Sequence, residues 1–247
     1  MIIFNAGVPR SGTVLVNAMI RALLAQRSIP VVQANPHGQQ LPDLIRQILR
    51  LGEYRHRPFL VHTHSWSEET ERVLGDKDQT IAIANYRDPR DVCVSLMRLH
   101  DLTFDEGQQA VQAFFREFEG MVAALDALVI PYELLIAAPG AHCFQIARHL
   151  GLWPTFDQID AVVEETSIDR HRKTMQDVQA GQVAQMTERQ NRRRVLREDR
   201  KTLINDRHIQ SGVSGRWRDE LDVEQQAQAN EAFKPILERY GYATGQP

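Results

Sequence analysis

Cysteine is scarce in this sequence of 247 residues, which contains only Cys93 and Cys143. Both stand in apolar surroundings and outside any metal-ligand spacing, so we expect neither a disulfide framework nor a bound metal, and a reducing cytoplasm fits best. No apolar run approaches the roughly 20 residues that span a bilayer. The N-terminal residues also lack a basic region followed by an apolar stretch and a cleavage site. We therefore expect a cytoplasmic protein without a membrane partner.

A large excess of charge of one sign is also missing. The formal net charge is -3, so nothing global indicates a nucleic acid or an anionic membrane as partner. Any anionic ligand must then be bound by local positive groups. Internal repeats, low-complexity segments and a convincing linker are absent from the sequence as well. With 43% hydrophobic residues, the chain suits one large core, and we expect a single domain over residues 1–247.

Short apolar segments alternate with amphipathic ones along the first two thirds of the chain. The patterns predict strands at 2–6, 31–32, 59–61, 80–86 and 128–130, and helices at 13–26, 41–51, 89–99, 104–125 and before Gly151. This alternation predicts an α/β fold with a central parallel sheet flanked by helices. Beyond Trp153 we expect no strand, but two or three helices, a loop at 211–215 and a last helix through Tyr240. The C-terminal third is therefore predicted to be helical.

The loop Val8–Thr13, between the first strand and helix, has the features of an anion site. Such a loop presents backbone N–H groups at the positive end of a helix dipole. Gly12 allows close approach, Arg10 adds a positive charge, and Ser11 and Thr13 add hydroxyl donors. The loop lacks the Gly-Lys-Ser/Thr of a nucleotide triphosphatase, which holds magnesium. Taken alone, the pattern fits a structural turn equally well.

A second candidate anion site begins where the predicted strand 80–86 ends. Arg87 stands at the carboxyl end of that strand, where open α/β sheets bind their ligands. Ser95 follows eight residues later, inside the next helix, and an Arg and a Ser that converge there would make a phosphate clamp. Taken alone, Arg87 fits a surface ion pair better.

Together the two patterns resemble the sulfotransferase family, as a bacterial-type member. That family opens with Pro-Lys/Arg-Ser-Gly-Thr, which binds a 5'-phosphate, and here the matching residues are 9–13. It continues with Arg-Asn/Asp-Pro-Lys/Arg-Asp-x-x-x-Ser, whose Arg and Ser grip a 3'-phosphate, and here these are Arg87 and Ser95. The resemblance implies a sulfotransferase fold of the P-loop-containing nucleotide-hydrolase type. It also implies 3'-phosphoadenosine 5'-phosphosulfate (PAPS) as co-substrate and PAP as product, without a metal.

Weaker similarities extend the resemblance over most of the chain. Residues 131–135 resemble the family's Tyr-Glu-Asp-Leu segment, residues 166–168 its adenine contact Thr-Ser-Phe, and residues 212–218 its Gly-x-x-Gly-Asp-Trp-Lys lid segment. The implied nucleotide-binding residues are Arg10, Ser11, Gly12, Thr13, Val14, Arg87, Ser95, Thr166, Ser167, Ile168, Gly212 and Arg216.

A histidine after the third predicted strand is the implied general base. Many family members carry Lys-Thr/Ser-His there, and His64 of the segment 62–64 falls on that histidine. An imidazole with a pKa near 6.5 suits proton abstraction from an acceptor hydroxyl at neutral pH. Without the motif, a structural histidine bonded to backbone would be the better interpretation. His62 replaces the family's lysine, and its role stays open.

The sequence departs from the family pattern in several places. Arg10 stands where many members have Lys, and because Arg stays charged we expect it to stabilise the leaving group rather than donate a proton. Gln210 and Ser211 replace the basic pair before the lid glycine, and Ile168 replaces the stacking Phe. The basic stretch 189–201 is predicted to be a solvated helix, with a positively charged lid as the alternative. Acidic residues that interrupt it make duplex nucleic acid a poor partner.

Three functions stay open at this point. The first is sulfuryl transfer to a hydroxyl or amine acceptor, with Arg10 and His64 as catalytic residues and a small molecule or glycan as acceptor. The second is a catalytically inactive relative that binds PAP or PAPS. The third, a nucleotide-dependent phosphoryl-transfer enzyme, requires ATP and magnesium, which the first loop does not favour. The acceptor and the oligomeric state are not encoded in any recognisable motif.

Overall fold

The computed structural model describes residues 1–34, 40–75, 77–184, 186–191, 194–199, 202–205 and 213–244. The chain divides into two compact units. Unit 1 consists of Met1–Arg87 and Val111–Val162, and unit 2 consists of Asp88–Ala110 and Val163–Pro247. The organisation as a single domain over 1–247 stays a prediction.

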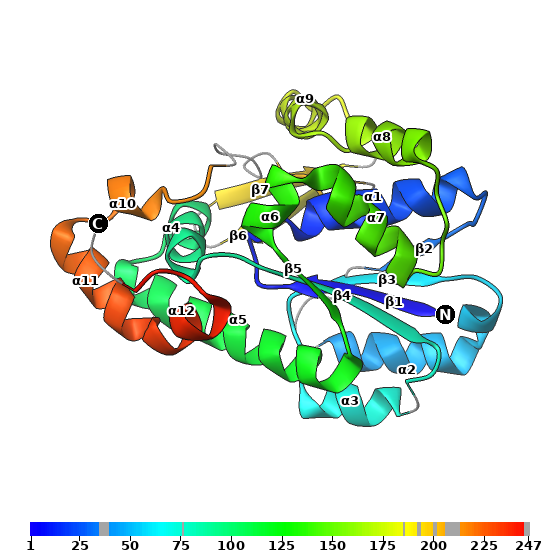
Figure 1. Ribbon diagram of the computed structural model, residues 1–247, viewed down its shortest axis with the longest axis horizontal. Coiled ribbons are helices and arrows are strands. Elements are labelled where there is room, and N and C mark those ends of the chain that lie inside the picture. Colours follow the sequence, from blue (N-terminus) through cyan, green and yellow to red (C-terminus); the bar gives the residue numbers. More distant parts are fainter. Residues whose placement is uncertain are drawn as a thin grey trace. The chain divides into compact units, whose positions relative to one another are not determined.

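A parallel sheet with the strand order β2-β3-β1-β4-β5 forms the centre of unit 1 (Figure 1). Its strands are β1 (Ile2–Gly7), β2 (Val32–Ala34), β3 (Phe59–Thr63), β4 (Thr80–Tyr86) and β5 (Leu128–Pro131). Every residue of β1 is buried, because strands in the middle of a parallel sheet are covered on both faces. The predicted α/β fold with a central parallel sheet is confirmed.

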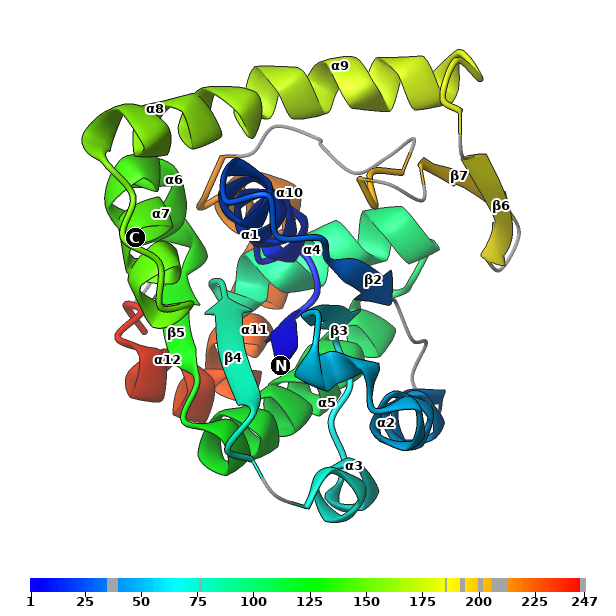
Figure 2. The ribbon, with the colours of Figure 1, turned by 90° about the vertical axis from the view of Figure 1, so that its right-hand side faces the viewer.

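Helices cover both faces of this sheet, as Figures 1 and 2 show. On one face lie α1 (Thr13–Gln26) and α7 (Pro139–His149), and Asn5 of β1 donates to the Thr13 carbonyl of α1 at 2.8 Å. On the other face lie α2 (Leu41–Leu51), α3 (Glu68–Leu74) and the later part of α5 (Phe104–Leu125). The elements η2 (Glu53–Arg55), α6 (Tyr132–Ala137) and α8 (Phe156–Glu165) complete the list. The sheet is therefore buried between two helical layers.

Local capping signals place several of these helix ends. The Ser67 hydroxyl accepts a hydrogen bond from the Thr70 N–H and caps the start of α3. Gly52 ends α2 in a left-handed conformation with φ of 66°.

Cys93 and Cys143 are buried free thiols, and burial raises the pKa of each to about 12. Neither cysteine is therefore a nucleophile at neutral pH.

Unit 2 contains helices and one hairpin. The helices are α4 (Pro89–His100), α9 (Ile168–Gln179), α10 (Trp217–Glu220), α11 (Val223–Ala232) and α12 (Lys234–Tyr240). The predicted last helix is two helices, since Pro235 at the start of α12 interrupts the backbone hydrogen bonding. Among the described residues, no helix is long and apolar enough to cross a membrane.

The expectation that no strand follows Trp153 is wrong. Strands β6 (Met186–Asn191) and β7 (Arg194–Asp199) form an antiparallel hairpin, so the solvated-helix interpretation of 189–201 is wrong as well for its described residues. Glu188 stands opposite Arg197 in the hairpin, and their side chains form an ion pair at 3.1 Å. Opposite charges on facing residues favour this pairing. The sequence of this stretch shows no alternation of apolar and polar residues, because nearly all of its residues are polar or charged. Its strands were therefore not predicted.

Candidate functional site

The loop between β1 and α1 has a special backbone. Arg10 and Gly12 both have positive φ angles, of 69° and 86°. A Cβ atom added to Gly12 would lie 2.9 Å from Cδ2 of Tyr132 and 3.3 Å from a methyl carbon of Leu135. Glycine is therefore required here on two grounds, the left-handed backbone and the close contact with the Tyr132 ring.

The N-terminus of α1 has no side-chain cap. Its first helical hydrogen bond runs from the Val16 N–H to the Gly12 carbonyl, and no acidic residue stands in the first turn. The N–H groups of residues 12–15 thus lack acceptors within the helix, and no carboxylate of that turn offsets the dipole. Unsatisfied N–H groups at a helix N-terminus, together with the preceding Ser11 N–H, are suited to bind an anion.

The Ser11 hydroxyl donates to the main chain, whereas the sequence predicts it as a donor to an anion. Its buried hydroxyl lies 2.5 Å from the Val8 carbonyl oxygen and 3.1 Å from the Asn85 carbonyl oxygen, to which its single hydrogen can be donated. The Val8 N–H also donates to the Asn85 carbonyl, at 2.9 Å. The Ser11 side chain therefore ties the loop to the end of β4, and only its backbone N–H is left as a donor for an anion.

Two arginines of unit 1 act on each other electrostatically. Arg87 follows the end of β4 and stacks on Tyr132, with its guanidinium carbon 4.5 Å from the ring centroid. Burial, and next the positive charge of Arg87, lowers the pKa of Arg10 from 12.5 to about 10. Tyr132 acts on the Arg10 pKa in the opposite direction. Arg10 keeps its charge at neutral pH, and an anion between the two guanidinium groups would relieve their repulsion.

His64 is held in one tautomer by the main chain. Its Nδ1 atom lies 2.8 Å from the Gly7 carbonyl oxygen. A carbonyl oxygen only accepts, so Nδ1 carries the proton and Nε2 of the neutral ring carries the lone pair. This hydrogen bond fits a structural histidine bonded to the backbone. It also fits a general base, because it fixes the ring and leaves Nε2 as the basic nitrogen.

His62 packs against His64 and is neutral. The ring centroids lie 5.0 Å apart, with the planes at 81°. Burial, and next the charge of His64, lowers the pKa of His62 well below 6.5. Its Nε2 atom is buried and has no hydrogen-bond partner among the described residues. His62 therefore does not supply the positive charge of the lysine that the family pattern has at this position.

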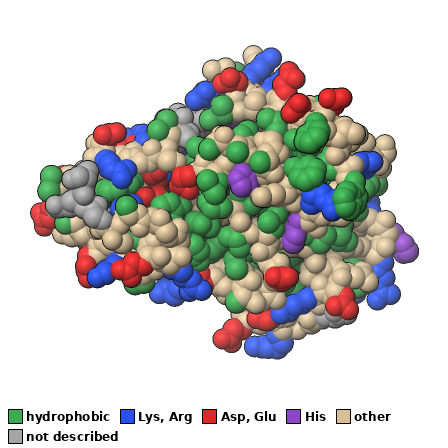
Figure 3. Space-filling view, in the orientation of Figure 1, with side chains coloured by type: hydrophobic (Ala, Val, Ile, Leu, Met, Phe, Trp, Pro, Cys, Tyr) green, Lys and Arg blue, Asp and Glu red, His purple; other side chains and the backbone are tan. Residues whose placement is uncertain are grey.

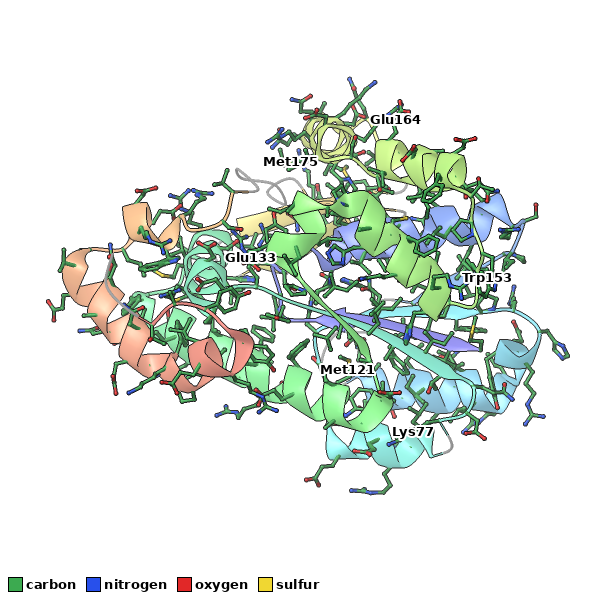
Figure 4. The ribbon with its side chains drawn as sticks, in the orientation of Figure 1. Lys77, Met121, Glu133, Trp153, Glu164 and Met175 are labelled. Atoms are coloured by element: carbon green, nitrogen blue, oxygen red, sulfur yellow. The ribbon has the colours of Figure 1, made fainter. Side chains whose placement is uncertain are left out.

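Tyr86 and Glu133 lie at the carboxyl ends of β4 and β5. Tyr86 is the last residue of β4, and its ring lies 6.0 Å from that of Phe118 in α5. Glu133, labelled in Figure 4, is the second residue of α6. Burial, and next the Glu133 carboxylate, raises the pKa of Tyr86 above 10. Tyr86 is therefore protonated at neutral pH and is excluded as a base.

The other predicted residues belong to unit 2. Ser95 is buried on α4, and Thr166 is buried before α9. Ser167 caps α9 by accepting from the Arg170 N–H, Ile168 is 42% exposed, and Arg216 pairs with Glu220. Gly212 lies outside the described residues. Their role in binding stays a prediction of the sequence.

The described residues show no acidic, histidine or cysteine cluster of three or more that could hold a metal ion. Lysine and arginine are interspersed with aspartate and glutamate over the face in Figure 3. Since the net charge is -3, the chain has no general excess of positive charge. An anionic ligand would therefore depend on local cations such as Arg10 and Arg87.

Comparison with known proteins decides the family. The model described as "Sulfotransferase domain" matches residues 2–241. The chain belongs to the sulfotransferase family. A search among curated proteins finds no match to the sequence.

Solved structures share the fold of this sulfotransferase. Mouse sulfotransferase SULT7A1 complexed with PAP aligns with a TM-score of 0.65 and 17% identity, over 96% of this chain and 84% of the other. Retinol dehydratase with androsterone and inactive cofactor PAP aligns with a TM-score of 0.62 and 18% identity, over 96% and 80%. Its complex with retinol and PAP aligns with a TM-score of 0.59 and 18% identity, over 100% and 83%. The sulfotransferase fold predicted from the motifs is confirmed.

The structure adds residues that the sequence did not mark as part of the candidate site. Tyr132 contacts both the Gly12 backbone and the Arg87 guanidinium. Asn85 contributes its backbone, which lies so close to Gly7 that a Cβ there would be 2.4 Å from the Asn85 oxygen. The motif at 131–135 was the available signal for Tyr132. No sequence signal indicated Asn85, because its role lies in the main chain.

Proposed function

We propose that this sulfotransferase transfers a sulfuryl group from PAPS to a hydroxyl or amine acceptor. The observation that carries the proposal is the pair of Arg10 and Arg87, whose charges act on each other at the carboxyl end of the sheet. Two such cations beside an uncapped helix N-terminus favour a ligand with more than one anionic group. PAP, with its two phosphate groups, is a ligand of this kind.

The binding roles follow the family motifs that residues 9–13 and Arg87 resemble, and the local geometry of unit 1 supports them. The N–H groups of residues 11–14 and the Arg10 guanidinium would bind the 5'-phosphosulfate. Arg87, held on the Tyr132 ring, would bind the 3'-phosphate. Ser95, residues 166–168 and Gly212 are added from the sequence resemblance alone. Arg216 stands where the family motif has Asp, and it is added as one of the basic residues, with Arg207, His208 and the basic stretch upstream, that could replace the pair lost at Gln210 and Ser211.

Arg10 acts in this proposal as a fixed charge. With a pKa of about 10 it keeps its proton at neutral pH, so it stabilises the negative charge that develops on the departing phosphate. Such stabilisation is strongest in a partly buried site, where the effective dielectric constant is lower than in water.

His64 acts as the general base. Bound PAPS supplies an activated sulfuryl group, whose sulfur–oxygen bond to the 5'-phosphate breaks as the acceptor oxygen bonds to sulfur. His64 Nε2 takes the acceptor's proton, and the O–H electron pair enters the new bond to sulfur. The Gly7 carbonyl supports this step, since the hydrogen bond from Nδ1 stabilises the imidazolium that forms.

The acceptor is proposed by class only. The solved complexes of retinol dehydratase contain androsterone and retinol, and for this chain we propose a small-molecule or glycan acceptor. The cytoplasmic location stays a prediction of the sequence.

Calorimetry with PAP tests the binding proposal. The unaltered chain should bind PAP, and Arg87→Ala should weaken binding about 10- to 100-fold, since a hydrogen bond between charged groups contributes roughly 1.5–3 kcal/mol. Arg72→Ala is the matched control, because Arg72 is exposed on α3. Absence of PAP binding by the unaltered chain would sink the proposal.

Turnover with labelled PAPS over an acceptor panel tests the base. His64→Asn keeps an N–H donor near the position of Nδ1 and removes the basic nitrogen, so kcat should fall about 10²- to 10⁴-fold while PAP affinity is kept. His56→Asn, at an exposed position, is the control. If His64→Asn turns over at a near-normal rate, the base assignment is wrong. PAP binding without turnover of any acceptor by the unaltered chain would favour the inactive relative.

A further inference from the structure

The residues after Arg87 in the second motif are engaged inside unit 2. Asp88 is the N-cap of α4 and accepts from the Arg90 N–H at 2.9 Å. Its carboxylate also accepts two hydrogen bonds from the Arg90 guanidinium, at 2.9 Å and 2.7 Å. Arg90 is only 2% exposed. This bidentate pairing keeps the buried Arg90 charge balanced.

The remaining side of Arg90 contacts the C-terminal helices. Nη1 donates to Asn230 Oδ1 of α11 at 2.7 Å and to the Ala243 carbonyl at 3.0 Å. The guanidinium also stacks on the fully buried ring of Trp217, 4.0 Å from its centroid. Every nitrogen of this guanidinium thus has an acceptor within unit 2. Arg90 is therefore a structural cation of unit 2.

Asp91 holds the segment that leads into α10. One carboxylate oxygen accepts from the Gly215 N–H at 2.7 Å and the other from the Trp217 N–H at 3.1 Å. Asp91 is 3% exposed, and α10 packs beside α4. Residues 91 and 215 are 124 positions apart, so this is a tertiary contact that fixes the backbone on both sides of Arg216.

The Arg216 side chain is linked to α4 through Glu220. It pairs with Glu220, and Glu220 also pairs with Arg98 of α4 at 2.6 Å. The backbone hydrogen bonds to Asp91 and the side-chain link through Glu220 therefore both hold Arg216. Both links end on α4, the helix that follows directly after Arg87.

We infer that Arg90, Asp91 and Arg98 of α4 form a clasp that positions Arg216 for the nucleotide without touching the nucleotide themselves. The inference rests on the proposed function, in which Arg216 contributes to nucleotide binding. The motif then has two tasks: its first residue binds an anion, and Arg90 and Asp91 order the C-terminal segment 213–217. A positioning role of this kind changes nucleotide affinity, while the rate of the bound complex stays the same.

Asp91→Asn tests the clasp. Its carboxamide can accept one N–H through Oδ1, but its NH₂ group faces the other N–H and cannot accept from it. We expect hydrogen exchange at the Gly215 and Trp217 amides to rise about tenfold. The PAP Kd and the KM for PAPS should also rise about tenfold, and kcat at saturating PAPS should change less than about twofold. Asp219→Asn, an exposed carboxylate on α10, is the matched control and should behave as the unaltered chain.

The outcomes separate this inference from the proposed function. If the unaltered chain does not bind PAP, the proposed function fails first, and the clasp fails with it. If the unaltered chain binds PAP and Asp91→Asn binds equally tightly, only the clasp is overturned. A fall in kcat at unchanged affinity also overturns it.

A second variant covers the case in which Asp91→Asn does not fold. Arg98→Ala removes a side chain that is 49% exposed, so folding should be kept while Glu220 and Arg216 lose their side-chain link to α4. We expect about a threefold loss of PAP affinity at unchanged kcat. Unchanged affinity of this folded variant would overturn the clasp.

Discussion

Replacement of Gly12 by alanine tests the contact on which the anion loop depends. Gly12 has φ of 86°, and an added Cβ would lie 2.9 Å from Tyr132 Cδ2. Carbon atoms pack best at about 3.5–4.0 Å, so the Tyr132 ring would have to move by roughly 0.6 Å or more. The same ring supports Arg87 at 4.5 Å. Gly12→Ala should therefore affect both folding stability and nucleotide binding.

Gly52 supplies a matched control for the magnitude. It has a left-handed backbone with φ of 66°, but an added Cβ would meet nothing within 4 Å. Gly52→Ala should thus cost only the left-handed conformation, about 1–2 kcal/mol of unfolding free energy. Gly12→Ala bears that cost and also an overpacking cost of about 1–3 kcal/mol. The difference between the two variants isolates the contact with Tyr132.

Thermal unfolding and calorimetry measure the two consequences. For a chain of this size, about 1 kcal/mol shifts Tm by roughly 2–4 °C, so Gly12→Ala should melt roughly 2–12 °C below Gly52→Ala. Its PAP Kd should rise about tenfold, which corresponds to about 1.4 kcal/mol, while Gly52→Ala keeps normal affinity. Equal Tm values and equal PAP affinities for the two variants would refute the packing of Gly12 on Tyr132.

Three further predictions concern buried side chains. Ser11→Ala should lower the unfolding free energy by about 1–2 kcal/mol in denaturant titrations, because the Val8 and Asn85 carbonyl oxygens lose the one hydroxyl donor that they share, and should keep PAP affinity within about threefold. Trp217→Phe should cost much less than the roughly 3–5 kcal/mol of Trp217→Ala in the same assay, because the indole N–H has no acceptor among the described residues; equal losses would contradict this. The lowered pKa of His62 means that the unfolded chain binds more protons below pH 6.5, so stability is full above that pH and falls as the pH drops towards 5. His62→Gln should reduce this slope by up to about 1.4 kcal/mol per pH unit in unfolding titrations at several pH values, and an unchanged slope would contradict the assignment.

Sequence reasoning succeeded where local pattern and local chemistry coincide. Helices 41–51 and 104–125 and strand 80–86 have the predicted bounds, because apolar periodicity and their glycine and proline signals act within each segment. The spacing from Arg87 to Ser95 and the loop at 9–13 identified the family before any fold was known. The hairpin β6–β7 was missed, since its cross-strand pair of Glu188 and Arg197 exists only after the chain turns back.

The sequence by itself determined the order of strands and helices in the first two thirds of the chain and the presence of two cationic motifs. Tertiary structure alone decided which groups several of the motif residues contact. It directs the Ser11 hydroxyl to carbonyl oxygens, holds His64 as the Nδ1–H tautomer through Gly7, and engages Arg90 and Asp91 within unit 2. Each of these roles depends on an acceptor or donor that is remote in the chain or belongs to the main chain. A residue's type states what it can bond to, and only the folded chain selects the partner.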